Sequence, residues 1–307
     1  MAKALVLGGN GFIGSHLADQ LANSGLEVTV FDRFSGNNNF TNPSIVAMKG
    51  DFFDDQQLIN ALQFQDYVFH FLSTSNPYIA ESQPASDIEY SITRTVQLLE
   101  FCTHSKPKKF IYASTGGAIY GETTASSPFS EDSLPMPISP YAIGKLAVEH
   151  YLHFFRKVHG LNTLSLRISN PYGSRQRAGK SQGLIPITLE RVLEGQPVIK
   201  FGDGSMMRDY IFIDDLVKMI EKVGLGDSKN NLYNLGSGQS YSVNQVFQAV
   251  HNLLAEPLQV IEQPQPSSFV QDVALDISRY SDEFGQMELT SLEKGIELTL
   301  ARMKKGL

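Results

Sequence analysis

The stretch that decides the fold is residues 4–14, which read Ala4-Leu-Val-Leu-Gly8-Gly-Asn-Gly11-Phe-Ile-Gly14. An apolar, strand-like run leads directly into three glycines spaced three residues apart, and the helical pattern Ser15–Asn23 follows. Gly8 permits a tight turn, Gly11 lets a pyrophosphate approach the backbone, and Gly14 lets the helix pack close to the sheet. Because a helix N-terminus attracts anions, the turn predicts a dinucleotide site, to which Phe12 and Ile13 also contribute.

An acidic residue follows at the expected distance. The strand-like run Glu27–Phe31 ends at Asp32, eighteen residues after Gly14, where a carboxylate can accept hydrogen bonds from the ribose hydroxyls. Asp32 would repel a 2′-phosphate and so favours NAD, whereas Arg33 beside it would attract one and leaves NADP open. Asp51 and Phe52, after the strand-like Ile45–Lys49, are predicted to flank the adenine.

The first 170 residues alternate β-rich runs with helical patterns, which is typical of a parallel sheet. Apolar residues recur at helical spacing in Ile88–Leu99 and Leu146–Val158. With right-handed crossovers on both faces, this alternation predicts an α/β fold with a doubly wound parallel sheet. The predicted strands are Ala4–Leu7, Glu27–Phe31, Asp66–Leu72, Phe110–Ala113 and Thr163–Ile168. His70, within one of them, is interpreted as a buried histidine.

The domain organisation follows from where this alternation stops. Four prolines from Pro128 to Pro140 predict an irregular loop that leads into a helix at Tyr141. After Asn170 the alternation is lost. We predict a dinucleotide-binding domain at 1–169, with a segment returning at about 210–236, and a smaller substrate-binding lobe at 170–209 and 237–307. The alternative is that the later residues are an edge of the same domain.

Composition excludes several classes of protein. The 25 Lys and Arg against 32 Asp and Glu give a net charge of −7, without the basic clusters that nucleic-acid binding needs. No run of 18 apolar residues and no secretion signal occurs. Cys102 stands alone, which excludes an intrachain disulfide and a cysteine metal cage. We therefore expect a cytoplasmic protein with no nucleic-acid, membrane or metal partner.

Tyr141 and Lys145 are the chemical centre of the sequence. They are four residues apart in a predicted helix and so lie on one face within one turn. A free phenol titrates at about 10, so a tyrosine is a poor base at neutral pH unless positive charge stabilises its phenolate. We expect Lys145 and a nicotinamide cation to shift the pKa toward neutrality, so that Tyr141 can take a proton from a sugar hydroxyl as hydride leaves the same carbon. On its own such a pair is usually surface decoration.

A hydroxyl partner is expected at the end of the strand before the proline-rich loop. Ile111-Tyr-Ala-Ser114-Thr115-Gly-Gly supplies two candidates. Thr115 is predicted to orient the reacting hydroxyl between Tyr141 and the nicotinamide, with Ser114 in reserve. The alternative is that both side chains only cap the strand end.

Four motifs together resemble the extended short-chain dehydrogenases, and more narrowly the nucleotide-sugar epimerase/dehydratase family, with UDP-glucose 4-epimerases the most similar. They are the glycine turn, the Tyr141/Lys145 pair, Arg167-Ile-Ser-Asn170-Pro-Tyr-Gly, and Gly202-Asp-Gly-Ser-Met-Met-Arg208-Asp-Tyr. The resemblance extends from Ala4 to about Leu300. It implies a Rossmann lobe for NAD, a C-terminal lobe for the nucleotide diphosphate, and homodimers joined through the helices at 88–99 and 141–158. By position, Thr115, Tyr141 and Lys145 match the catalytic residues, and Asn170 and Arg208 the diphosphate contacts.

The sequence departs from the family in three places. Thr115 is followed by Gly116-Gly117 rather than the Asp-Glu of the sugar dehydratases, which speaks against a 4,6-dehydratase. The position of a second diphosphate arginine holds Pro266, for which Arg175 or Arg177 could substitute. The usual Asn-x-x-Gly-Thr before the long helix is here Ser91-Ile-Thr-Arg94-Thr95, so one cofactor contact is expected to differ.

These observations predict an NAD-dependent 4-epimerase of a UDP-linked sugar that works through a transient 4-keto sugar. One rival is an NAD(P)-dependent reductase or dehydrogenase of a nucleotide-linked keto sugar, which Arg33 keeps open. The other is a non-catalytic dinucleotide sensor, against which the intact Tyr141/Lys145 pair counts. The identity of the sugar does not follow from the sequence.

Overall fold

The computed structural model describes residues 1–73, 77–121, 128–176, 183–265 and 270–305. The chain divides into two compact units. Unit 1 comprises Met1–Thr115, Pro137–Arg167 and Val217–Tyr233, and unit 2 comprises Gly116–Met136, Ile168–Leu216 and Asn234–Leu307. The binding roles predicted for two domains stay predictions.

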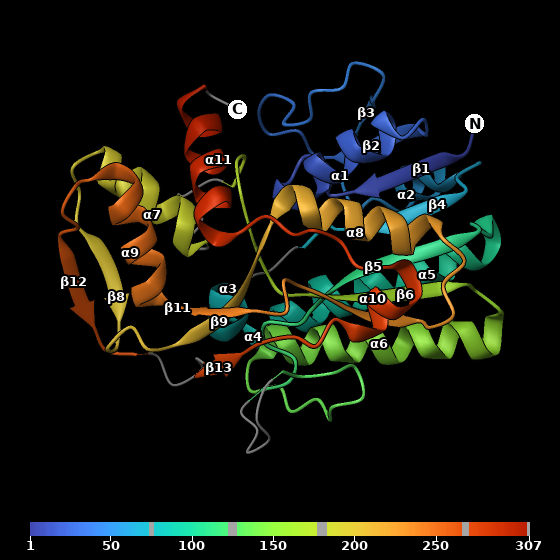
Figure 1. Cartoon of the computed structure of the whole chain (residues 1–307). Helices are drawn as coiled ribbons and strands as arrows, with labels where there is room; N and C mark the ends of the chain where they lie inside the picture. The colour runs from blue at the N-terminus through green and yellow to red at the C-terminus, as the bar shows by residue number, and fades with distance from the viewer. Residues whose placement is uncertain (74–76, 122–127, 177–182, 266–269, 306–307) are drawn as a thin grey trace. The chain divides into compact units, whose positions relative to one another are not determined.

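A seven-stranded parallel sheet forms the centre of unit 1 and confirms the predicted fold class (Figure 1). Its order is β10 (Leu232–Leu235), β6 (Thr163–Ile168), β5 (Lys109–Thr115), β4 (Tyr67–His70), β1 (Lys3–Leu7), β2 (Glu27–Asp32), β3 (Val46–Lys49). The chain moves outward from β1 to β2 and β3, then returns to pair β4 with the other side of β1. The carboxyl ends of β1 and β4 therefore flank a topological switch point, where ligands bind in such sheets.

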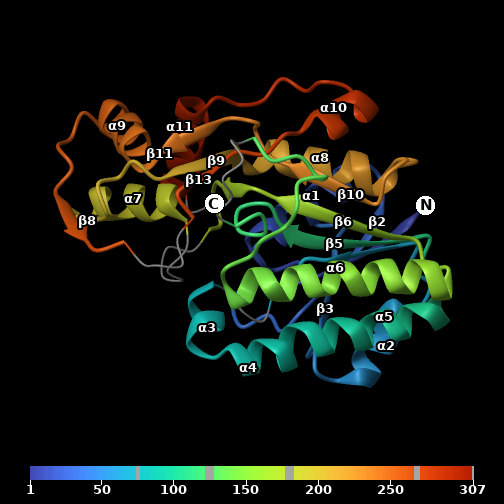
Figure 2. The ribbon, with the colours of Figure 1, turned by 90° about the horizontal axis from the view of Figure 1, so that it is seen from below.

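Helices cover both faces of this sheet (Figure 2). One face carries α2 (Asp55–Leu62), α5 (Arg94–Ser105) and α6 (Pro140–His159), and the other carries α1 (Phe12–Asn23) and α8 (Ile213–Leu225). The core between α5, α6 and the sheet includes Leu98, Val148 and Leu152, all at most 1% exposed. Burial on both faces explains why the strands read as continuous apolar runs.

The helix predicted at 88–99 is not a single regular helix. The chain forms α3 (Pro77–Ser82) and α4 (Pro84–Asp87), then a π-helix, η1 (Ile88–Thr93), and only then α5. The wider turn of a π-helix changes which side chains face the sheet, and such turns often occur at functional sites. The apolar spacing in the sequence could not distinguish this turn from an α-helix.

Local signals explain where α6 begins and ends. The Ser139 side chain accepts a hydrogen bond from the Ala142 N–H, and Pro140 occupies the first turn, where its missing N–H costs nothing. Gly160 ends the helix with φ +67°. The predicted entry into a helix at Tyr141 is therefore confirmed.

Unit 2 is built on β9 (Met207–Phe212), which pairs in parallel with β7 (Asn170–Tyr172) and β13 (Asp272–Val273) and antiparallel with β11 (Ser240–Ser242). A separate parallel pair joins β8 (Val198–Phe201) and β12 (Val260–Gln263). The helices are α7 (Leu184–Leu193), α9 (Val243–Leu254), α10 (Ser278–Phe284) and α11 (Leu292–Lys304). None of the helices formed by the described residues combines the length and hydropathy of a membrane span.

Candidate active site

The glycine turn has the geometry that its sequence predicts. Gly8 has φ +77°, and a Cβ there would lie 2.5 Å from Cα of Leu72. A Cβ on Gly14 would lie 2.3 Å from the carbonyl oxygen of Gly8. Larger residues at these two positions would push the segment after β4 away from the turn, or α1 away from it.

The start of α1 is shaped to receive an anion. Gly11 is the N-cap residue and offers no side chain to the N–H groups of the first turn, which begins with Phe12 and Ile13. Those groups and the helix dipole favour a phosphate. The turn thus fits the pyrophosphate of a dinucleotide, and its glycines leave room for close approach.

Asp32 lies beside this turn at the end of β2, as predicted. Its Oδ2 accepts a hydrogen bond from the Asn10 N–H at 3.2 Å, and its Oδ1 accepts one from the Phe34 N–H at 3.4 Å. Arg33 is exposed. The structure therefore brings the predicted ribose acceptor to the glycine turn while leaving Arg33 on the surface.

The adenine-flanking candidates occupy different environments. Asp51 is exposed and accepts a hydrogen bond from the Phe53 N–H at 3.0 Å. Phe52 is 4% exposed, and its ring stacks on His70 with centroids 5.4 Å apart. Arg94, at the position of the family's glycine, donates to the Phe52 carbonyl at 2.5 Å and lies over the rings of both phenylalanines. Arg94 therefore holds the backbone beside Asp51.

Tyr141 and Lys145 lie together in the first turns of α6, against β5. The Lys145 Nζ donates to the Ala113 carbonyl at 2.8 Å and lies 5.6 Å from the Tyr141 ring centroid. Both residues line a pocket of unit 1, together with His70, Asp87, Ser91 and Tyr112. The structure thus brings the predicted base and its cationic partner into one pocket.

Burial dominates the electrostatics of this pair. It raises the pKa of the Tyr141 phenol to about 12, and the charge of Asp87 adds to the rise. Burial also lowers the pKa of the Lys145 ammonium to about 8, while Asp87 and Glu149 act in the opposite direction. In the chain itself, lost hydration and Asp87 therefore move the phenol away from neutrality, and the shift expected from Lys145 together with a nicotinamide cation stays a prediction.

The two hydroxyl candidates at the end of β5 differ in their partners. Thr115 is the last residue of β5 and is 9% exposed. Ser114 donates to Oε1 of Glu149 at 2.6 Å, and Glu149 forms a buried ion pair with Arg167 at 2.7 Å. Because the Ser114 hydroxyl is held by this ion pair, the structure favours Thr115 over Ser114 as the residue available to substrate.

The predicted diphosphate contacts belong to unit 2. Asn170 begins β7 beside Tyr210 of β9, and its Nδ2 donates to the Asp209 carbonyl at 3.1 Å. Arg208 precedes Asp209 on β9, and its guanidinium donates to the Met207 carbonyl at 2.7 Å. Asn170 and Arg208 therefore lie on neighbouring strands, whereas Arg177 and Pro266 lie outside the described residues.

Three polar residues near the pair were not predicted. Asp87 and Ser91 line the pocket, and Glu149 lies one turn beyond Lys145 on α6. The departure at Ser91 was the available signal, because Asp87 precedes it by one helical turn. No group of three metal-ligating side chains is found in the part of the chain that the structure describes.

Comparison with known proteins places these features in a family. The model of the NAD dependent epimerase/dehydratase family matches residues 4–236. The solved UDP-glucose 4-epimerase of Thermotoga maritima, crystallised with UDP-glucose, is 35% identical with a TM-score of 0.92, covering 99% of each chain. That of Thermus thermophilus, a complex with NAD, is 30% identical with a TM-score of 0.92, covering 99% of this chain and 100% of that chain. An Escherichia coli dTDP-4-dehydro-6-deoxyglucose reductase is 28% identical over 95% of both chains. These matches confirm the predicted resemblance, the Rossmann fold and NAD as the cofactor.

Proposed function

Because the chain belongs to the NAD dependent epimerase/dehydratase family, we propose that it is a 4-epimerase of a UDP-linked sugar. The observation that carries the proposal is the Tyr141/Lys145 pair, which shares a pocket of unit 1 and is joined to β5 through the Ala113 carbonyl. A base with a neighbouring cation suits removal of a hydroxyl proton.

In the proposed reaction, Tyr141 accepts the proton of the sugar 4-hydroxyl as the C4–H bond breaks and a C4 carbonyl forms. When held at the glycine turn and Asp32, NAD would supply a hydride acceptor for C4, from which the hydride can return to the other face of the turned ring. Tyr141 then gives its proton back to the oxygen, so the cofactor and the enzyme end unchanged. Thr115 is proposed to orient the hydroxyl, and Lys145 to supply positive charge beside the phenolate.

The pKa of Tyr141 sets a requirement on this mechanism. Since burial and Asp87 hold it at about 12 in this chain, Tyr141 needs positive charge beyond Lys145 to act as a base near neutrality. The nicotinamide cation would provide it. Lys145, with a pKa of about 8, is mostly protonated at neutral pH and loses its charge above pH 8.

Unit 2 is proposed to hold the nucleotide diphosphate. Arg208 offers a planar fork of donors to phosphate oxygens, and Asn170 an amide donor. Arg177 is retained as a further candidate for the role of the arginine that Pro266 replaces. The Gly116-Gly117 sequence after Thr115 has no acid to protonate a leaving hydroxyl, which favours an epimerase over a 4,6-dehydratase.

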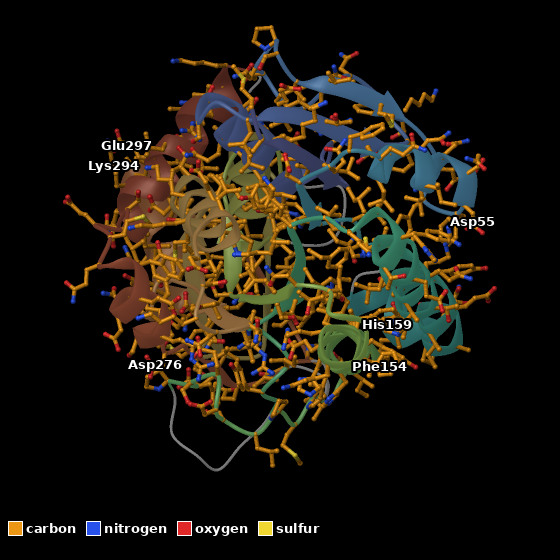
Figure 3. The ribbon with its side chains drawn as sticks, turned by 90° about the vertical axis from the view of Figure 1, so that its right-hand side faces the viewer. Asp55, Phe154, His159, Asp276, Lys294 and Glu297 are labelled. Atoms are coloured by element: carbon orange, nitrogen blue, oxygen red, sulfur yellow. The ribbon has the colours of Figure 1, made fainter. Side chains whose placement is uncertain are left out.

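A homodimer is proposed on the outer face of α6. Four apolar side chains there are between 42% and 62% exposed: Ile143, Tyr151, Phe154 and Val158. Figure 3 shows one of them, Phe154, with His159, whose ring lies 5.4 Å from it. An exposed apolar patch of this kind is typical of an interface. Sedimentation should show a dimer that Phe154→Glu dissociates; a monomeric wild-type protein would contradict this.

The rival is a reductase or dehydrogenase of a nucleotide-linked keto sugar. It is favoured by the exposed Arg33 beside Asp32 and by the similarity to the Escherichia coli reductase. Such an enzyme would consume one cofactor per turnover, whereas the epimerase regenerates its NAD in each cycle.

The first test is a panel of UDP-hexoses with their N-acetyl and uronate forms. Product formation is followed by NMR, with absorbance at the reduced-nicotinamide band. A 4-epimer without net cofactor reduction supports the proposal and identifies the sugar. Net cofactor turnover supports the reductase, and no reaction with any UDP-sugar refutes the epimerase.

The second test replaces the base. Tyr141→Phe is expected to lower kcat by about 10³-fold, the scale of general acid–base catalysis, while NAD still binds. Tyr151→Phe, on the exposed side of the same helix, keeps the aromatic ring of the proposed dimer interface; it is the matched control and should leave kcat unchanged. Equal activity of Tyr141→Phe and wild type would exclude Tyr141 as the base.

A further inference from the structure

A buried carboxylate lies in the pocket of the catalytic pair. Asp87 is the last residue of α4 and is 6% exposed. It lines the same pocket as Tyr141 and Lys145. A buried charge is costly unless it is paired, so its position in one pocket with the half-buried ammonium of Lys145 calls for a functional explanation.

The position of Asp87 is fixed from two sides. The Ser91 hydroxyl donates to its Oδ1 at 2.9 Å, across one turn at the start of η1. On the other side, a Cβ built on Gly144 would lie 3.0 Å from its Oδ2. Gly144 lies between Tyr141 and Lys145 in α6, and its missing side chain lets the carboxylate approach the helix between them.

Ser91, in the π-helix, belongs to a series of hydrogen bonds that continues through Thr95 to the buried His70. The Thr95 hydroxyl donates to the Ser91 carbonyl at 2.7 Å, and Thr95 Oγ1 lies 3.1 Å from Nε2 of His70. Since the Thr95 hydroxyl donates its proton to the Ser91 carbonyl, its oxygen accepts a hydrogen bond from Nε2 of His70. These bonds tie the turn that carries Ser91 to the end of β4 and so hold the carboxylate in place.

The charged and titratable groups around Asp87 come from every neighbouring element. They are Tyr141, Lys145 and Glu149 on α6, Tyr112 on β5, His70 on β4 and Tyr90 on η1. Burial lowers the pKa of His70 to about 3, so this ring stays neutral. Lys145 is the cation among these groups.

We propose that Asp87 is the counter-charge of Lys145 in this pocket, and thereby a positioning residue for the catalytic pair. The inference rests on the proposed function for its consequence in turnover. The charge of Asp87 raises the pKa of Lys145 and so favours its protonated form despite burial. The same charge raises the pKa of Tyr141 and so disfavours its phenolate. It therefore sets the pH range in which both groups have the required charges.

The sign of the effect is the same for both groups. Asp87 raises the pKa of Tyr141 and that of Lys145, so Asp87→Asn lowers both. Activity requires Tyr141 to lose its proton on the acid side and Lys145 to keep its proton on the alkaline side. Both limbs of the pH–kcat/KM profile should move to lower pH, by about one unit, the lower end of what a neighbouring charge does.

The experiment compares pH profiles of kcat/KM for wild type, Asp87→Asn and Asp87→Glu, with NAD saturating. Glu89→Gln, which removes an exposed carboxylate two residues away, is the matched control. The inference predicts a shifted profile for Asp87→Asn, a position restored by Asp87→Glu, and no shift for Glu89→Gln. A uniform loss of activity with unmoved limbs would mean that Asp87 is only structural and would overturn the inference.

A second readout needs no turnover. The rate at which acetic anhydride acylates the Lys145 amine is measured against pH by peptide mass spectrometry. The midpoint should lie at about pH 8 in wild type and lower in Asp87→Asn; equal midpoints would overturn the inference. If wild type epimerises no UDP-sugar, the proposed function fails while this measurement still decides the role of Asp87.

Discussion

Two of the buried aspartates, Asp209 in unit 2 and Asp87 in unit 1, are held in different ways. In unit 2, Asp209 is fully buried and accepts hydrogen bonds from the N–H and hydroxyl of Ser237 and from the N–H groups of Gly238 and Leu275. In unit 1, Asp87 accepts from the Ser91 hydroxyl and presents its other oxygen to the backbone of Gly144.

The difference in their partners distinguishes a buried carboxylate that stabilises the fold from one that acts on a functional site. Asp209 joins the turn at 236–238 to the strand segment before Asp276, so its carboxylate replaces backbone pairing that these segments lack. Asp87 joins no strands and lies in a pocket beside an ammonium and a phenol. A carboxylate surrounded by backbone donors stabilises the fold, whereas one that faces titratable side chains changes their charge.

The largest expected effect tests this separation directly. Asp209→Asn turns an amide N–H₂ toward backbone donors and leaves two of them without an acceptor, so we expect a loss of about 4 kcal/mol in the free energy of unfolding. Asp87→Asn should cost less than about 1 kcal/mol, because the half-buried Lys145 ammonium keeps its hydrogen bond to the Ala113 carbonyl. Urea unfolding of both variants measures the difference, and equal losses would break the comparison.

Glu149 sharpens the comparison because it is a carboxylate buried near Lys145 but held in another way. It lies one turn from Lys145, but its oxygens are bound by Arg167, which is 3% exposed, and by Ser114. Glu149→Gln leaves the guanidinium buried without its partner, and we expect destabilisation of about 3 kcal/mol. The matched variant is Glu297→Gln, in an exposed pair with Lys294 (Figure 3). If Glu149→Gln lost no more unfolding free energy than Glu297→Gln, the result would contradict the account.

The pocket of unit 1 should be sensitive to acid through His70. Its pKa is about 3 in the folded chain against 6.5 when exposed, so the unfolded chain binds more protons between these values. Stability is full above pH 6.5 and falls as the pH drops toward 3, with a loss of about 2 kcal/mol at about pH 5. Unfolding of His70→Phe should lack this loss, and the exposed His104→Asn serves as control. An unchanged pH dependence in His70→Phe would assign the acid sensitivity elsewhere.

The smallest effects come from the two serines that hold the aspartates. Ser237→Ala removes one of several donors to Asp209 and should cost about 1 kcal/mol of stability without altering the pH profile. Ser91→Ala should cost a similar amount but also disturb the pH profile, since it releases Asp87. Calorimetry and kcat/KM profiles of both variants separate the two roles. A shifted profile for Ser237→Ala would show that the comparison is wrong.

Sequence reasoning predicted the parts of the molecule whose geometry is local. The spacing of Gly8, Gly11 and Gly14 describes one strand–turn–helix unit, and the spacing of Tyr141 and Lys145 describes one helical turn. Both were therefore visible without knowledge of the tertiary structure. The strands of the sheet were equally clear, because burial on both faces makes them continuous apolar runs.

What could not be predicted depends on contacts between distant segments. Asp87 reaches the proposed catalytic pair only because Gly144 lets α4 approach α6, and Asp87 and Gly144 are 57 positions apart. The π-helix was hidden because its apolar spacing resembles that of an α-helix. The raised pKa of Tyr141 in the chain itself depends on burial, which a sequence motif does not report.

The central claim is that hydride leaves C4 of the sugar and returns to the same carbon. The most direct measurement is to incubate the protein and NAD with a UDP-hexose that carries deuterium at C4, and to follow the product by NMR and mass spectrometry. The account predicts a 4-epimer that keeps its deuterium at C4, with no reduced cofactor accumulating. Deuterium found in released reduced cofactor, or product that has lost the label to solvent, would contradict the proposed epimerase mechanism.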